Sequence, residues 1–230
     1  MRRATNQGLN TRADYTFPMT VSAIHLLRGL PVFPVDMPHF SPEAAPSTPA
    51  ELFLQWLQQA IDDGVRAPHA VNVATVDSDG CPDARVVILK DITEDYWAFA
   101  SSSNSPKGKQ LELTPSAALT FFWPEAGRQI RIRGKVLPGS AEENQSDFNR
   151  RHPDARALVT AGNQSSVVGS LAEVHEAVAR VEAPDSDPSW TVYNVAAHSV
   201  EFWQADHQRL HTRVRYVRQA EGWTRELLWP

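Results

Sequence analysis

Short runs of β-branched and aromatic residues, separated by turn sequences, cover most of the chain after residue 69. Turn clusters such as the one at residues 77–80 leave too little chain between neighbouring runs for a helical crossover, so adjacent strands are expected to be antiparallel. This pattern predicts a mainly β protein, built as a barrel or a sandwich. The predicted strands are residues 70–76, 84–92, 96–101, 116–123, 129–138, 190–204, 212–219 and 222–229.

Helices are predicted only around these strands. Thr48 and Pro49 fit the N-cap and the first position of a helix whose apolar residues recur at helical spacing. A short helix is expected at residues 105–114, inserted between two strands. Residues 141–160 and 169–182 are helical or loop-like, and the second of these segments carries an apolar face.

The N-terminal part of the chain is rich in proline. Six of the 17 prolines fall within residues 31–49, where they fix φ and remove backbone donors, so neither a helix nor a central strand is expected there. We expect residues 1–48 to form an extended arm and residues 49–230 to form one barrel domain. Residues 1–18 are expected to be a disordered extension or to precede a true start at Met19, and they lack the apolar stretch of a secretory signal.

Composition excludes several classes of function. The 230 residues carry 22 Lys and Arg against 27 Asp and Glu, a net charge of −5, so no nucleic-acid partner is expected. No apolar run reaches the roughly 18 residues of a membrane helix, so no membrane partner is expected either. Cys81 is the single cysteine, which excludes an intramolecular disulfide and favours the reducing cytoplasm. No metal-ligand spacing, nucleophile elbow or nucleotide-binding glycine loop is present in the sequence, and no metal is expected.

Several basic residues stand where they could bind an anion. Arg85 and Lys90 bracket the apolar run of residues 86–89. Lys107 and Lys109 lie in the first turn of the short inserted helix, where the helix dipole disfavours a cation unless an anion binds nearby. Backbone donors at a helix N-terminus together with a lysine indicate a phosphate site. The alternative is a solvated lysine pair on a surface helix.

Arg209 and His211 are two residues apart, so they are expected to share one face of a strand, beside a hairpin turn and near an aromatic ring. A guanidinium and an imidazole held together suit an anionic or hydrogen-bonding substrate.

Five motifs follow one another along the chain: ARVVILK (84–90), SPKGKQL (105–111), WPEAGRQIRIRGKV (123–136), NQSSVV (163–168) and VEFWQADHQRLHTRVRY (200–216). Together they resemble the pyridoxine/pyridoxamine 5'-phosphate oxidase family of FMN-dependent enzymes, and the match spans roughly residues 49–230. The resemblance implies an antiparallel Greek-key split β-barrel that forms a homodimer with two FMN sites at the interface. It also implies an oxidase that uses a small-molecule substrate and O2.

The resemblance also assigns site residues. FMN contacts are implied for Arg85, Val86, Val87, Ile88, Leu89, Lys90, Ala100, Ser101, Pro106, Lys107, Gln129, Gln164, Ser165, Trp203 and Arg213. Substrate contacts are implied for Lys90, Asp147, Arg151, Ala155, Arg209 and His211, of which Arg209 and His211 are the implied catalytic pair. Arg85, Lys107 and Arg213 would supply charge for the FMN phosphate and the pyrimidine edge of the flavin.

Three positions depart from the family pattern. Pro106 stands where the family has an arginine, which removes one phosphate contact. Asp147 and Ala155 align with a tyrosine and a serine that bind the substrate phosphate, and an aspartate there would repel a dianion by on the order of 1 kcal/mol. The segment LPVFP (30–34) resembles the phenazine-biosynthesis flavin oxidases of the same family, whose substrates carry no phosphate.

These observations favour an FMN-dependent oxidase that takes a hydride from a reduced aromatic or heterocyclic substrate, like a phenazine precursor, and passes the electrons to O2 to give H2O2. The alternative is a pyridoxine/pyridoxamine 5'-phosphate oxidase that makes pyridoxal 5'-phosphate. A flavin- or heme-binding barrel without turnover is a second alternative, although a pure binder would not need Arg209 and His211. A nucleic-acid-binding barrel is disfavoured by the net charge and by the lack of aromatic residues interleaved with Arg131 and Arg133.

Overall fold

The computed structural model describes residues 23–162, 164–182 and 184–230. The expected extension of residues 1–18 and the alternative start at Met19 lie outside these described residues.

The chain divides into two compact units between Val32 and Phe33. The described part of the first unit contains one short helix, α1 (Ala23–Arg28), with no buried residue. This helix departs from the extended conformation expected over residues 1–48, because no proline lies between residues 19 and 30 to prevent it.

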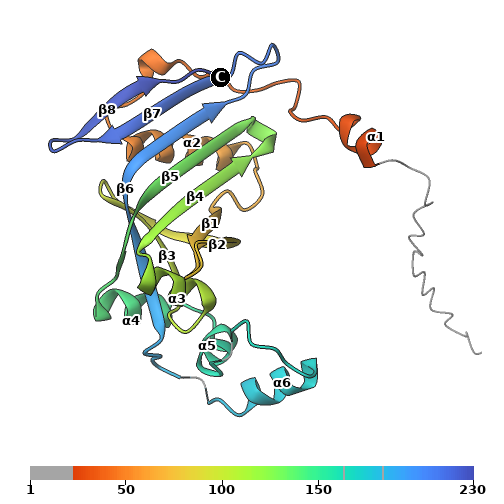
Figure 1. Ribbon diagram of the computed structural model, residues 1–230, viewed down its shortest axis with the longest axis vertical. Helices are drawn as coiled ribbons and strands as arrows, with labels where there is room; N and C mark the ends of the chain where they lie inside the picture. The colour runs from red at the N-terminus through yellow and green to blue at the C-terminus, as the bar shows by residue number, and fades with distance from the viewer. Residues whose placement is uncertain (1–22, 163, 183) are drawn as a thin grey trace, which may run out of the picture. The chain divides into compact units, whose positions relative to one another are not determined.

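Six antiparallel strands of the second unit close into a barrel, and two more extend the sheet (Figure 1). The order of hydrogen-bonded neighbours is β3-β2-β1-β4-β5-β6-β7-β8, and an additional pairing of β3 with β6 closes the ring. Because β4 returns to lie beside β1 after the consecutive β1, β2 and β3, these four strands form a Greek key. The strands are β1 (Ala70–Val76), β2 (Pro82–Ile92), β3 (Tyr96–Ser102), β4 (Ser116–Trp123), β5 (Arg128–Pro138), β6 (Trp190–Gln204), β7 (Thr212–Arg218) and β8 (Trp223–Leu227). The expected antiparallel split barrel is confirmed.

Strand β6 connects the two ends of the barrel. Its 15 residues pair with β3 in the first half, with β7 in the second half and with β5 along most of its length. The pairing with β5 shifts register between Arg133 and Gly134. At this bulge the strands approach so closely that a Cβ on Gly134 would lie 2.2 Å from the carbonyl oxygen of Ala196, so only glycine fits.

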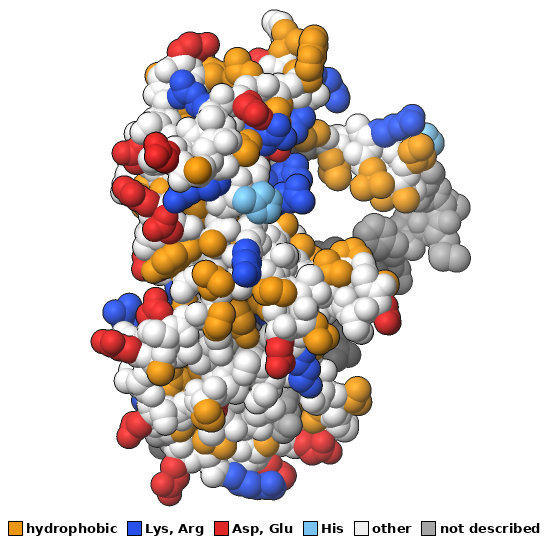
Figure 2. All heavy atoms as spheres, turned by 60° about the vertical axis from the view of Figure 1, so that its left-hand side comes forward, with side chains coloured by type: hydrophobic (Ala, Val, Ile, Leu, Met, Phe, Trp, Pro, Cys, Tyr) orange, Lys and Arg blue, Asp and Glu red, His pale blue; other side chains and the backbone are white. Residues whose placement is uncertain are grey.

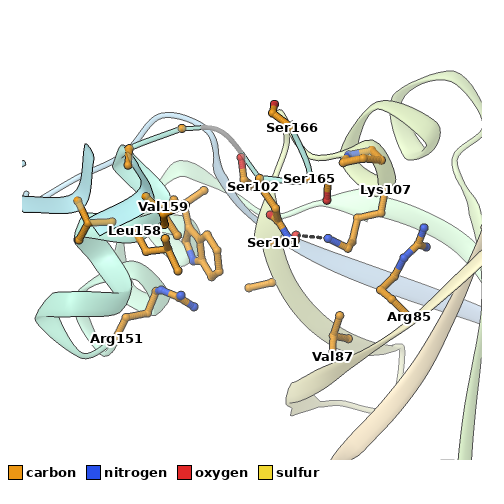
Figure 3. A pocket seen from close by; sticks show the side chains of 18 of the residues that line it. Arg85, Val87, Ser101, Ser102, Lys107, Arg151, Leu158, Val159, Ser165 and Ser166 are labelled. Atoms are coloured by element: carbon orange, nitrogen blue, oxygen red, sulfur yellow. Dashed lines mark hydrogen bonds between the residues drawn. The ribbon is translucent and has the colours of Figure 1, made fainter. Parts of the chain in front are cut away.

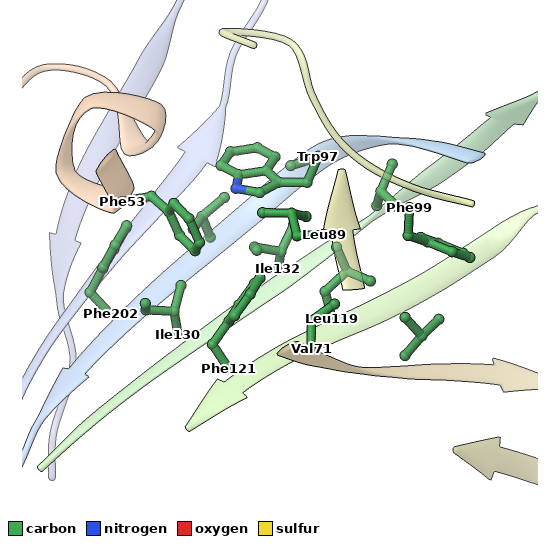
Figure 4. Packing of buried hydrophobic residues seen from close by; sticks show 14 of the residues in the cluster. Phe53, Val71, Leu89, Trp97, Phe99, Leu119, Phe121, Ile130, Ile132 and Phe202 are labelled. Atoms are coloured by element: carbon green, nitrogen blue, oxygen red, sulfur yellow. The ribbon is translucent and has the colours of Figure 1, made fainter. Parts of the chain in front are cut away.

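Aromatic and branched aliphatic side chains fill the barrel (Figure 4). The Phe53 ring lies 4.9 Å from that of Phe121 and 6.4 Å from that of Trp97, measured between centroids. Ile130 and Ile132 of β5 point inward and are fully buried, as the alternating pattern of this strand requires. Each such side chain contributes roughly 2 kcal/mol by leaving water.

Two helices begin where the sequence predicts. Helix α2 (Pro49–Asp62) starts after Thr48, whose Oγ1 accepts a hydrogen bond from the backbone N of Glu51 at 3.3 Å. It buries Phe53 and Trp56 against the barrel. Helix α3 (Pro106–Leu113) starts after the N-cap Ser105 and is inserted between β3 and β4.

Three further helices lie between β5 and β6. They are α4 (Ala141–Asn149), α5 (Pro153–Thr160) and α6 (Leu171–Ala179), and α5 and α6 lie beyond the end of the barrel in Figure 1. No residue of α6 is buried. The apolar face predicted for this segment therefore does not pack in the core, and Val174 and Val178 line a cavity instead.

The proline-rich segment 33–49 is anchored to the barrel. Phe40 packs edge-on against Trp56 with 5.1 Å between ring centroids, and the Tyr216 hydroxyl donates to the carbonyl oxygen of Pro46 at 2.8 Å. The segment contains one turn of 3₁₀ helix, η1 (Pro42–Ala44). The expectation of no helix fails at these three residues, because proline suits the first position of such a turn.

Candidate active site

A cavity of about 1220 Å³ opens between β2, the end of β3, the N-terminus of α3 and the helices α5 and α6. Figure 3 shows Arg85 and Lys107 on one side of this cavity and Arg151 on the other, with Ser101 between them. We call the side formed by β2, β3 and the start of α3 the strand wall, and the side formed by α5 and α6 the helix wall. The strand wall is cationic and rich in hydroxyl groups, whereas the helix wall also presents the apolar side chain of Leu158.

Lys107 is a buried cation in the strand wall. Only 5% of the residue is exposed, and its Nζ donates to Ser101 Oγ at 3.0 Å and to Ser105 Oγ at 3.4 Å. Burial lowers the pKa of Lys107, and the charge of Arg85 lowers it further. No carboxylate in the described part of the chain forms an ion pair with this ammonium group. A buried ammonium without a counter-ion is costly, so this wall favours the entry of an anion.

The neighbouring Arg85 is fixed by its own hydrogen bonds. Its Nη1 donates to Thr75 Oγ1 at 2.6 Å, and its Nη2 donates to Asp83 and to Gln110 Oε1, the latter at 3.3 Å. These bonds hold the guanidinium beside Lys107 and share its charge with the exposed carboxylate of Asp83. Lys107 therefore carries the less compensated positive charge of the pair.

A second polar cluster borders the helix wall. Lys90 Nζ lies 3.5 Å from Asp147 Oδ1, and the indole Nε1 of Trp190 donates to Asp147 Oδ2 at 2.9 Å. The Arg151 guanidinium lies over the Trp190 ring, 3.9 Å from its centroid, and burial lowers the pKa of Arg151. Lys90 and Arg151 carry two positive charges, and Asp147 carries one negative charge. One positive charge is therefore left for a ligand.

Apolar side chains complete the cavity wall. Val86 and Ile88 of β2 are 68% and 41% exposed, and Val167 and Val168 near α6 are exposed as well. Figure 2 shows apolar side chains exposed beside basic ones on one face of the molecule. Exposed branched side chains around a cavity suit contact with a flat apolar ligand or with a second chain.

A separate row of candidate residues crosses the other end of β6. Gln129 of β5 pairs with Trp203 of β6, and Trp203 pairs with Arg213 of β7. Arg213 donates from Nε and Nη2 to Glu201 Oε1, at 3.0 and 2.7 Å, so its charge is already paired. Three residues expected to contact the flavin thus share one row of the sheet.

The expected catalytic pair lies beside this row. Arg209 and His211 are in the loop between β6 and β7, so the expectation that they share a strand face is wrong. The cause is local: Arg209 adopts a left-handed conformation, φ 65°, which no strand accommodates. The His211 ring lies 4.7 Å from Trp203 between centroids, and Phe33 packs against both rings, at 5.6 Å from Trp203 and 6.5 Å from His211. The sequence reasoning missed Phe33, for which the motif at 30–34 was the only signal.

Most of the expected site residues therefore fall into two groups. Those lining the cavity are Arg85, Val86, Val87, Ile88, Lys90, Ala100, Ser101, Pro106, Lys107, Arg151, Gln164 and Ser165. Gln129, Trp203, Arg209, His211 and Arg213 form the second group, which we call the β6–β7 group, and none of them lines this cavity.

Three expected residues belong to neither group. Leu89 points into the core and lies in the buried cluster. Asp147 does not line the cavity itself, but it contacts two residues that do, through an ion pair with Lys90 and a hydrogen bond from Trp190. Ala155 does not line the cavity, and its carbonyl oxygen accepts a hydrogen bond from Arg151 Nη2 at 3.4 Å.

Among the described residues, no helix has the length and apolar character that crossing a membrane requires. Residues 23–162, 164–182 and 184–230 also contain no cluster of three or more His, Cys, Asp or Glu side chains that could hold a metal ion.

Comparison with known families supports the sequence motifs. The model of a family described as pyridoxamine 5'-phosphate oxidase matches residues 57–204, which is more than half of the chain. The chain belongs to the pyridoxamine 5'-phosphate oxidase family. A second model, described as the pyridoxine 5'-phosphate oxidase C-terminal dimerisation region, matches residues 190–230 and indicates a homodimer. Family membership makes the chain a flavin-dependent oxidoreductase of the oxidase type.

Two relatives match most of the chain in sequence. The pyridoxine/pyridoxamine 5'-phosphate oxidase of Haemophilus influenzae is 40% identical over 187 residues, which is 79% of this chain and 89% of that protein. The oxidase of the same name from Ectopseudomonas mendocina is 39% identical over 198 residues, or 81% of this chain and 90% of that protein.

Among solved structures, PhzG from Burkholderia lata in complex with tetrahydrophenazine-1-carboxylic acid has a TM-score of 0.78 at 32% identity, over 84% of this chain and 99% of that chain. A pyridoxamine 5'-phosphate oxidase-related, FMN binding protein from Nostoc punctiforme shares the fold, with a TM-score of 0.67 at 16% identity over 80% of this chain and 98% of that chain.

Proposed function

We propose that the cavity binds FMN, with the phosphate at Lys107 and Arg85. The observation that carries this proposal is the buried Lys107 ammonium, which has only hydroxyl partners and faces the cavity. The N-terminus of α3 adds the positive end of a helix dipole, although Pro106 has no N–H and the N–H of Gly108 already donates to Ser105 Oγ at 3.2 Å. Pro106 occupies the first position of this helix and brings no charge, so Lys107 supplies the cation of α3 that faces the anion.

The β6–β7 group completes the flavin site of the partner subunit in this proposal. Trp190 borders the cavity and Trp203 belongs to the β6–β7 group, yet both lie on β6, thirteen residues apart. At about 3.3 Å per residue this is roughly 40 Å of strand, more than one flavin nucleotide can bridge. A two-fold dimer formed through residues 190–230 would bring the cavity of one chain to the β6–β7 group of the other.

We propose a reduced aromatic or heterocyclic substrate with a single negative charge, of the phenazine-precursor type. The Lys90–Asp147 ion pair supports this choice, because it leaves one uncompensated positive charge where a phosphate dianion would need two. The apolar residues of β2 and the rings of Trp203 and Phe33 suit a flat hydrocarbon surface. The likeness to PhzG, whose structure contains a tetrahydrophenazine carboxylic acid, agrees with this choice.

FMN, when bound, would supply the redox chemistry: the substrate would lose a hydride and a proton, and O2 would gain two electrons and two protons to give H2O2. The chain's own residues would position the reactants. Lys107 and Arg85 would fix the phosphate, Ser101 and Gln164 would offer hydrogen-bond partners, and Arg209 and His211 would orient the substrate. The exposed Cys81 suits a reducing compartment, and we propose the cytoplasm.

A second candidate is pyridoxine/pyridoxamine 5'-phosphate oxidase activity. The identity of 40% with the Haemophilus influenzae enzyme favours it, as does the retention of Lys90 and Arg151 at the cavity. Asp147 argues against this activity, because its ion pair with Lys90 neutralises the charge that would bind the substrate phosphate.

The two candidates are separated by measuring H2O2 release from purified, FMN-loaded protein. We expect a higher kcat/KM with a reduced phenazine carboxylic acid than with pyridoxine 5'-phosphate. The same assay with flavin-free protein corrects for spontaneous oxidation of the reduced compound. A higher kcat/KM with pyridoxine 5'-phosphate would overturn the proposal, and absence of peroxide from both substrates despite bound FMN would favour a non-catalytic flavin-binding protein.

A further inference from the structure

The loop between β6 and β7 is held by a dense set of local hydrogen bonds. Asp206 Oδ1 accepts from the backbone N of Gln208 at 2.8 Å and of Leu210 at 3.3 Å. The backbone N of Arg209 donates to the Asp206 carbonyl oxygen at 3.0 Å, and Arg209 is left-handed. Non-glycine residues adopt this conformation at a cost of roughly 1–2 kcal/mol, so the surrounding bonds must impose it.

The same loop fixes the protonation pattern of His211. The backbone N of Asp206 donates to His211 Nδ1 at 3.1 Å. A backbone N–H can only donate, so Nδ1 must present its lone pair, and the proton of the neutral imidazole must be on Nε2. The ring also contacts the rings of Trp203 and Phe33, which restricts its rotation.

His211 Nε2 is left available for a ligand. Within the described part of the chain no hydrogen-bond partner is found for this atom, and His211 is only partly buried. The exposed guanidinium of Arg209, two residues away, adds positive charge to the same loop. A neighbouring cation and a free N–H both favour an acceptor atom that carries negative charge.

We propose that the Asp206–His211 loop holds His211 as the Nε2–H tautomer, so that His211 acts as a hydrogen-bond donor to an acceptor atom of the substrate and not as the base that removes its proton. Asp206 is a positioning residue in this arrangement. The inference rests on the proposed function, because the substrate is the one proposed above. It narrows the substrate class to flat rings that present a carboxylate or phenolate oxygen, or an unprotonated ring nitrogen, to His211.

The tautomer is measured directly on the FMN-loaded protein. Two-bond ¹H–¹⁵N correlation spectra of protein labelled with ¹⁵N-histidine distinguish the two neutral tautomers, and His211→Gln assigns the His211 signals. At a pH where the imidazole is neutral we expect the Nε2–H pattern for His211. An Nδ1–H pattern, or a rapidly exchanging mixture of both tautomers, would overturn the proposal. This readout does not depend on turnover, so it stays informative if the proposed oxidase activity is not found.

Kinetic variants test the donor role separately. His211→Gln keeps an N–H near the position of Nε2, His211→Leu removes it, and His211→Glu replaces it with an acceptor. We expect kcat/KM to fall about 10- to 100-fold in the Leu variant, mainly through KM, to fall less in the Gln variant and to fall most in the Glu variant. Equal losses in the Gln and Leu variants, or activity of the Glu variant near that of the native protein, would contradict a donor role.

Removal of the Asp206 N–H tests the positioning step. Asp206→Pro deletes this donor, whereas Asp206→Asn keeps both the N–H and a side-chain acceptor for the loop. We expect the ¹⁵N spectrum of the Pro variant to show a mixture of tautomers and that of the Asn variant to keep the Nε2–H pattern. If the Pro variant does not fold, the native tautomer and the three His211 variants still decide the proposal.

Discussion

Lys90 and Asp147 face each other at the border of the cavity, with 3.5 Å between Nζ and Oδ1, and Trp190 donates to the other oxygen of the same carboxylate. The aspartate therefore does more than repel an anion. It also neutralises the charge of Lys90, a lysine that would otherwise bind an anion.

Removal of the Asp147 charge should shift substrate preference. In Asp147→Asn and Asp147→Tyr, Lys90 loses its ion pair and is free for a phosphate. We expect kcat/KM for pyridoxine 5'-phosphate to rise about 5- to 50-fold in both variants, more in the Tyr variant because its hydroxyl can donate to the phosphate. The value for a reduced phenazine carboxylic acid should change less. An unchanged ratio of the two values in either variant would contradict the role given to Asp147.

Lys107 should govern FMN binding. Lys107→Met is expected to weaken FMN affinity about 10- to 100-fold, the effect of losing one charge-assisted hydrogen bond. The apoprotein should be as stable as the native one or more stable, because a buried cation without a counter-ion is removed. Lys109→Met on the same helix is the matched control, since Lys109 is exposed and should change affinity less than twofold. Flavin fluorescence titration and thermal unfolding measure both effects.

FMN affinity should depend on pH through the same lysine. Burial, and then the charge of Arg85, place the pKa of Lys107 in the apoprotein below its ordinary value. A bound phosphate favours the charged amine, so binding takes up a proton in the window just above the lowered pKa, and affinity should fall as pH rises through it. In that window the apoprotein should become more stable as pH rises, because the unfolded chain, with an ordinary lysine, binds more protons. FMN titrations at successive pH values should show no such slope in Lys107→Met.

Arg209 should be important for activity but not for stability. Arg209→Gly removes the guanidinium and also the strain of a non-glycine residue in the left-handed conformation. The free energy of unfolding should therefore stay within about 1 kcal/mol of the native value. Arg209→Ala removes the same group but keeps the strain and should be the less stable of the two. Both should lose about 10- to 100-fold in kcat/KM if the guanidinium binds the substrate. Equal unfolding free energies of the two variants, or a kcat/KM near the native value in either, would contradict the role given to Arg209.

Mixed dimers should reveal whether each site uses two chains. One chain carries Lys107→Met, which disables the cavity, and the other carries Arg209→Gly, which disables the β6–β7 group. If the two groups join across the dimer, one site of the mixed dimer keeps both intact, and about half of the native activity should return. If each chain builds its own site, both sites stay defective. Differently tagged chains, co-expressed and purified in two steps, provide the sample.

The strands were largely predictable because each carries its own local signal. Alternating burial along β5, with Ile130 and Ile132 inside and Arg131 and Arg133 outside, is visible in the sequence as a period of two. The closure of the barrel by β3 and β6 has no such signal, since the paired residues are 88 to 100 positions apart in the chain. The closed barrel was expected only because the motifs resemble a family with that fold.

The candidate site was predictable in its members but not in its geometry. Motif matching identified Lys107, whereas its burial and its lack of a carboxylate partner depend on how α3 packs at the end of β3. Spacing placed Arg209 and His211 on a strand, because it could not anticipate that Asp206 bonds would fold those residues into a loop. Phe33 was missed because a single aromatic in a proline-rich segment carries no periodicity.

The pairing of β3 with β6 also bears on how the chain is synthesised. Residues 96–102 emerge from the ribosome long before their partners at 190–196, so both β3 and β5 present open edges until β6 follows. Open strand edges pair readily with other chains, and barrels closed by such distant contacts form slowly. Chains that end before β6 should therefore be lost to aggregation, and soluble yield should improve when translation is slowed or temperature is lowered during expression.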